Sequence, residues 1–193
     1  TIEEAEAILK YVKTKFARTM LGCLKVTQNN PRDTWAKVPM QDFTEEWTDE
    51  KLYKKYGFTG KVCRREGHYL KQIYAVSSFG NVSKNQIGGW IQSPANLSED
   101  GDCWVHPDGF VAQHAVISGD AQVYSGIVHD SALVDGKAII GHHSLDRQFP
   151  RVFGNAHITN NAHIWGEASV SGFVRVQDSA SVHDHAIVRD HVV

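Results

Sequence analysis

The sequence predicts a mainly β protein whose C-terminal part is a stack of short parallel strands. Three observations carry this prediction. A β-branched residue recurs at every sixth position, a small residue follows it four positions later, and Gly, Asn or Asp stands two positions after it. A period of six fits neither an amphipathic helix (about 3.6) nor a simple alternating strand (about 2), and it indicates a repeat whose units stack on one another.

The repeat runs back from the C-terminus through Val188, Val182, Val176, Val170, Ile164, Ile158 and Val152. It continues upstream through Val105, Val111, Ile117 and Val123 and, after the loss of one residue, through Val128, Val134 and Ile140. The alternation of a strand turns these residues and their small partners inward. The third-place Gly, Asn or Asp suits a turn with positive φ. Three such strands are expected to form one triangular coil, giving about five coils in all.

This pattern resembles the hexapeptide-repeat, left-handed parallel β-helix family. Two departures from the repeat stand out. Asp146, within HHSLDRQFPRVFG (142–154), occupies a position that the register assigns to the apolar core. A buried, unpaired carboxylate is costly, so we expect an outward loop there. The residue lost near Val128 is expected to kink a corner. Loops on a repeat scaffold often carry function.

Residues 68–104 read differently. Residues 69–76 and 87–91 look like two strands of a hairpin joined through Ser-Phe-Gly-Asn, placed to close the open end of the β-helix. The strings F-G-N-V, I-G-G-W-I and N-L-S-x-x-G-x-C-W resemble the opening of the YdcK-type hexapeptide-repeat acyltransferases. That resemblance covers about residues 69–193.

Residues 1–67 form a third unit. The Thr1 and Glu4 capping-box spacing and an apolar stripe predict a helix over residues 3–21, and residues 47–56 predict a short second helix. The phrases K-T-K-F-A-R, V-P-M-Q-D-F-T and W-T-D-E-K-L-Y-K-K-Y-G resemble the C-terminal tail of type II restriction-modification adenine methyltransferases, over residues 1–57. Their N-P-P-Y-type catalytic motif and cofactor loop are absent, so the resemblance implies an accessory or recognition segment. The expected division is 1–67, 68–104 and 105–193.

Composition narrows the class of protein. The 193 residues hold 20 Lys and Arg, 22 Asp and Glu, and 41% hydrophobic residues, enough to bury a core. Acidic residues outnumber basic ones by six over residues 73–193, which disfavours binding of nucleic acid. The sequence shows no apolar run long enough to span a membrane and no secretory signal. Cys23, Cys63 and Cys103 form neither a disulfide framework nor a zinc pattern, and we expect a cytoplasmic protein.

The family resemblance implies an acyl-CoA-dependent acyltransferase that uses a histidine as general base, with acetyl-CoA or another acyl-CoA held between adjacent subunits of a trimer. The candidate bases are His142 and His143, because Asp146 and Arg147 follow closely, and His114 is the next candidate. The alternative is that these histidines are polar surface residues. No two histidines show the H-x4-H spacing of β-helix carbonic anhydrases, so no metal is expected.

A non-catalytic function remains open beside the enzyme. Trp165, Phe173 and Ile187 occupy outward positions of the repeat, where they would form an interface or be covered by the N-terminal helices. We expect self-association as a homotrimer and a possible protein partner for residues 1–67. The protein would then be a binding, scaffold or inhibitory protein of bacterial or phage origin, connected with DNA modification, restriction or phage–host conflict.

Overall fold

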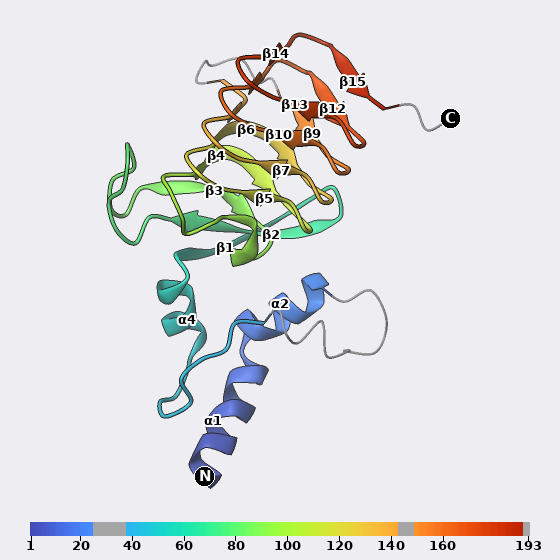
Figure 1. Ribbon diagram of the computed structural model, residues 1–193. Helices are drawn as coiled ribbons and strands as arrows, with labels where there is room; N and C mark the ends of the chain where they lie inside the picture. The colour runs from blue at the N-terminus through green and yellow to red at the C-terminus, as the bar shows by residue number, and fades with distance from the viewer. Residues whose placement is uncertain (25–37, 143–148, 191–193) are drawn as a thin grey trace.

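The protein is a triangular β-solenoid with its helices at one end (Figure 1). The computed structural model describes residues 1–24, 38–142 and 149–190. The helices are α1 (Ile2–Lys13), α2 (Lys15–Leu24), α4 (Asp49–Lys55) and the short 3-10 helix η1 (Pro94–Asn96). The strands are β1 (Phe58–Arg65), β2 (His68–Tyr74), β3 (Ile87–Ile91), β4 (Trp104–Val111), β5 (Val116–Ile117), β6 (Gln122–Val128), β7 (Leu133–Val134), β8 (Ile139–Ile140), β9 (Arg151–Val152), β10 (His157–Ile158), β11 (His163–Ile164), β12 (Ser169–Ser171), β13 (Arg175–Val176), β14 (Ser181–Val182) and β15 (Ile187–Arg189).

Parallel pairing from coil to coil arranges these strands in three faces. The β8 face consists of β8, β11 and β14 with the starts of β4 and β6. The β9 face consists of β9, β12 and β15 with the ends of β4 and β6. The β7 face consists of β5, β7, β10 and β13. The left-handed parallel β-helix of about five coils, expected from the hexads, is confirmed.

Hexad residues form the core of the solenoid. Ile140, Val152 and Ile158 are fully buried, and so are the small partners Ala156 and Ala162. Burying one such branched side chain stabilises the fold by about 1.5–3 kcal/mol, so each buried hexad adds to the stability of the stack. The third-place residues adopt the expected positive φ at the corners, as in Gly154, Asn160, Gly166, Gly172, Asp178 and Asp184.

The residue missing near Val128 is accommodated where the β8 face bends into the β9 face. Val105 and Val111 of β4 are six residues apart, whereas Val123 and Val128 of β6 are five apart. The pairing of β4 with β6 shifts register after Val105, and Gly126 takes a φ of 103° at the bend. The corner therefore absorbs the deletion as a local irregularity within a continuous strand.

The coil after β8 contains an insertion. Ile140 pairs with Val123 and Ile164 on the β8 face, and Val152 pairs with Val128 and Val170 on the β9 face. Ile140 and Val152 occupy consecutive core positions of the repeat but are twelve residues apart, whereas the regular spacing is six. The expectation for Asp146 concerns this insertion, and Asp146 lies outside the described residues.

A small antiparallel sheet closes the first coil. The expected hairpin is present as β2 and β3, and β3 continues into the solenoid by pairing in parallel with β4. Ile73, Ile91 and Trp104 are buried in the same core as the first hexads. Strand β1 pairs with β2, so residues 1–67, expected to be helical, also contain a strand. The division of the chain at residue 67 stays a prediction.

The N-terminal residues form two helices where one was expected over residues 3–21. The capping box of Thr1 and Glu4 starts α1 as expected. Thr14 interrupts the helix, because its backbone is extended and its hydroxyl accepts a hydrogen bond from the N–H of Ala17 at 3.1 Å. The carboxylate of Asp49 accepts a hydrogen bond from the N–H of Phe16 at 2.7 Å, which fastens α4 to α2. Among the described helices, none is long and apolar enough to cross a membrane.

The outward apolar residues of the last coils lie at the end opposite the helices (Figure 1). Phe173 is 75% exposed and Ile187 is 69% exposed, so the described helices do not cover them. Trp165 is half-buried, and the ring of His183, which stacks against it, covers part of its surface.

Candidate functional site

A row of rings follows the β8 face beside the insertion. His142 is exposed at the point where the chain leaves β8, and its ring centroid lies 6.2 Å from that of His163 in β11. His143 and Asp146, predicted as site residues, and Arg147 lie outside the described residues. The structure therefore brings His142 close to His163, which lies 21 residues later in the chain. His163 was not among the candidate bases predicted from the sequence.

Backbone geometry determines the proton position on His163. Its Nε2 lies 2.9 Å from the carbonyl oxygen of Gly141. A carbonyl only accepts hydrogen bonds, so Nε2 carries a proton, and in the neutral form of the ring Nδ1 is the nitrogen with the lone pair. This arrangement suits a general base, which needs a lone pair on an oriented ring.

The row continues through Trp165 to His183, and we call His142, His163, Trp165 and His183 the β8-face row. The rings of Trp165 and His183 stack at 4.8 Å, and the indole N–H of Trp165 donates to the hydroxyl of Ser181 at 3.2 Å. His183 in turn contacts the carboxylate of Asp184 at 2.9 Å. The row thus combines titratable rings with a flat aromatic surface on one face of the solenoid.

A second oriented histidine lies on the β7 face. The Nε2 of His157 lies 2.9 Å from the carboxylate of Asp135, and both side chains are 28% exposed. The pairing of β10 with β7 produces this contact, because Asp135 directly follows Val134 and His157 directly precedes Ile158. Sequence reasoning missed this pair, since 22 residues separate its members.

The remaining predicted histidine lies apart from the row. His114 is exposed at the bend between β4 and β5, where the β9 face turns into the β7 face. His142 follows the β8 face, at a different edge of the prism. His157 and His163, six residues apart, lie on different faces as their spacing predicts. No group of three or more His, Cys, Asp or Glu within the described ranges could hold a metal ion.

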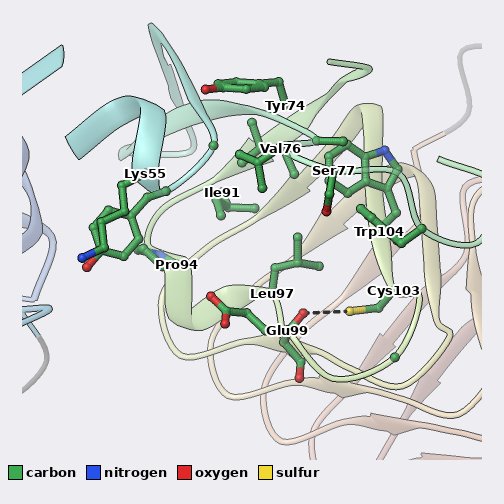
Figure 2. Close-up of a pocket in the computed structure, with 17 residues that line it drawn as sticks. Lys55, Tyr74, Val76, Ser77, Ile91, Pro94, Leu97, Glu99, Cys103 and Trp104 are labelled. Carbon is green, nitrogen blue, oxygen red and sulfur yellow. Dashed lines mark hydrogen bonds between the residues drawn. The ribbon is translucent and has the colours of Figure 1, made fainter. Parts of the chain in front are cut away.

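A cavity of about 430 Å³ lies at the other end of the molecule, between the cap and the first coil (Figure 2). We call it the cap pocket. It is formed by the last residue of α4 and the two residues after it, by the end of β2 with the turn that follows, and by the chain from β3 to β4. None of the predicted site residues lines it. Its walls consist of Lys55, Tyr56, Gly57, Ile73, Tyr74, Ala75, Val76, Ser77, Phe79, Ile91, Pro94, Leu97, Ser98, Glu99, Gly101, Cys103 and Trp104.

The thiol of Cys103 belongs to this pocket but is not a nucleophile at neutral pH. Burial raises its pKa to about 11. The sulfur lies 3.4 Å from the carbonyl oxygen of Ser98, to which the protonated thiol donates a hydrogen bond (Figure 2). Thiolates, and not thiols, attack electrophiles, so Cys103 acts as a small apolar wall residue.

Comparison with known proteins adds one short similarity. No family profile matches the chain. A protein from Escherichia coli (strain K12), described as the uncharacterized acetyltransferase YdcK, is 38% identical over 55 residues. The match covers 28% of this chain and 17% of the length of YdcK. It is consistent with a hexapeptide-repeat protein, whereas the methyltransferase resemblance of residues 1–57 receives no support.

Proposed function

We propose that this protein is an acyl-CoA-dependent acyltransferase whose general base is an imidazole of the β8-face row. The observation that carries the proposal is the hydrogen bond from His163 to Gly141, which orients the imidazole next to the exposed His142. The local similarity to YdcK supports the reaction class.

In the proposed reaction, Nδ1 of His163 removes a proton from the hydroxyl or amine of the acceptor. The acceptor atom attacks the thioester carbonyl, the C–S bond breaks, and the thiolate of CoA leaves and takes up a proton. His142 and His143 remain candidate bases, with Asp146 as a candidate partner. We also propose that acyl-CoA binds between adjacent subunits of a homotrimer, as the resemblance to hexapeptide-repeat acyltransferases implies.

The first test is calorimetric titration of the purified protein with acetyl-CoA, together with its mass in solution. We expect saturable binding at about one site per chain by a trimer. Release of the CoA thiol would then be followed with a panel of hydroxyl and amine acceptors. Replacement of a general base lowers turnover by about 10²–10⁴-fold.

Single variants separate the candidate bases. We expect one of His163→Ala, His142→Ala and His143→Ala to show the large loss of turnover. His157→Ala is a matched control on another face, and His114→Ala tests the next candidate base at another edge. The absence of acetyl-CoA binding by a folded oligomer would contradict the proposal. A large loss confined to His157→Ala would move the base to the β7 face.

A second function is favoured by the exposed residues of the last coils. Phe173 and Ile187 are largely exposed apolar side chains on a regular solenoid wall, as in a binding or scaffold protein. In that case the protein would bind no acyl-CoA, and substitutions of these two residues would change its assembly while the histidine variants would not.

A further inference from the structure

The cap pocket has the dimensions and walls of a small-molecule site. Its volume of about 430 Å³ falls in the range of about 300–1,000 Å³ typical of ligand pockets. Ile91, Leu97 and Trp104 supply apolar walls from the first coil, and Figure 2 shows them around one space with Val76 from the cap. An apolar cavity with a few polar groups at its edge binds ligands that have an apolar body.

The charged side chains at the edge of the pocket are not equivalent. The ammonium of Lys55 donates to the side-chain oxygen of Gln41 at 2.9 Å and lies 4.4 Å from the ring centroid of Trp47. Neither of these two partners lines the pocket, although Nζ also lies 5.8 Å from the ring centroid of Tyr56, which does, so the lysine charge is engaged in part outside the pocket. Within the described residues, no hydrogen bond or ion pair joins the carboxylate of Glu99 to another side chain.

We propose that the cap pocket binds an organic amine, with its apolar body against Leu97 and Trp104 and its ammonium beside the carboxylate of Glu99. A cation is favoured over a neutral or anionic group because Glu99 presents negative charge at the edge of the apolar walls. Glu99 is exposed, so the ion pair contributes the modest stabilisation typical of an exposed pair. The pocket joins the end of α4, the cap and the first coil, so a bound amine also holds the N-terminal segment on the solenoid.

The test uses 2-phenylethylamine as the probe and measures its binding to the full chain by calorimetry at low ionic strength. The matched ligands are 2-phenylethanol, which is neutral, and 3-phenylpropanoate, which is an anion. We expect the amine to bind about fivefold more tightly than the alcohol, the ratio typical of one exposed ion pair, and the anion to bind most weakly.

Three variants locate the site. Glu99→Gln should weaken amine binding about fivefold and leave alcohol binding unchanged. Asp100→Asn removes the neighbouring carboxylate, which does not line the pocket, and should leave both unchanged. Ser77→Trp fills the pocket from an exposed position and should abolish binding of both ligands.

Either of two results would overturn the proposal: equal binding of amine and alcohol, or a preference for the amine that survives Glu99→Gln. Absence of saturable amine binding at millimolar concentration would overturn it as well. Acetyl-CoA titration of the same variants is a separate measurement, so failure of this proposal is distinguishable from failure of the acyltransferase proposal.

Discussion

Lys71 shows how one residue joins the helices to the cap. It is 2% exposed, and its Nζ lies 4.6 Å from the ring centroid of Phe16 in α2 and 5.1 Å from that of Phe58 in β1. Contacts of a cation with aromatic faces contribute about 0.5–2 kcal/mol, whereas removing an ammonium from water costs several kcal/mol. The desolvation cost offsets what these aromatic contacts contribute, and the aliphatic stem packs the interface.

Lys71→Met tests this balance. We expect its free energy of unfolding in urea to equal or exceed that of the wild type, because Met keeps the length of the side chain without the cost of burying a charge. Lys71→Ala should lose about 2–3 kcal/mol through the cavity it leaves. Equal losses in both variants would show that the charge itself stabilises the fold.

Asp130 links the stability of one corner to pH. Burial tends to raise the pKa of its carboxyl, but hydrogen bonds from the N–H of Gly154 and from His129 outweigh this and lower the pKa. A lowered pKa means that the folded state favours the ionised form. The stabilisation is present above the ordinary carboxyl pKa and is lost as the pH falls through the lower pKa of the folded state.

Asp130→Asn should therefore lower the melting temperature at pH 7 more than at pH 3. Asn tolerates the φ of 58° found at this position, so the substitution changes charge with little backbone strain. Thermal unfolding of both proteins at the two pH values measures the difference. A deficit that is the same at both pH values would contradict the assigned cause.

At the scale of the strand, equivalent hexad positions differ in burial. Val152 of β9 is fully buried between two coils, whereas Val182 of β14 is half-buried in the last described coil. Removal of buried methyl groups costs their transfer free energy and that of the cavity left behind. The cost should therefore depend on coil number although the residue type is the same.

Val152→Ala should lower the free energy of unfolding by about 2 kcal/mol, and Val182→Ala by less than about 1 kcal/mol. Urea unfolding of the two variants under identical conditions gives the comparison. A larger loss for Val182→Ala would mean that the last coil is more enclosed in solution, for example by association of chains.

For the whole molecule, the expected homotrimer remains a prediction. Phe173 and Ile187 are exposed on the last coils, while Val62 is 53% exposed on β1 at the opposite end. Large exposed apolar side chains on a flat wall indicate an interface.

Light scattering should give the mass of three chains for the wild type and for Val62→Asp. The double variant Phe173→Asp/Ile187→Asp should give a smaller mass, because it places charges in the proposed interface. A monomeric wild type at micromolar concentration would contradict the prediction. A trimer that survives the double variant would place the interface elsewhere.

The period of six was sufficient to predict the architecture, because each hexad forms its strand and its corner from neighbouring residues. Ile158 and Asn160 illustrate this: the first is fully buried and the second has positive φ, as their positions predict. Strand β1 was not predicted, since its half-exposed residues lack a regular alternation and it depends on pairing with β2.

The candidate sites required the tertiary structure. His163 meets His142 and Gly141, and His157 meets Asp135, because coils stack in a register that includes the insertion after β8. The cap pocket combines three segments that are far apart in the chain. Local repetition in the sequence determined the solenoid, while contacts between coils and between cap and solenoid, which depend on distant segments, decided which polar groups lie together.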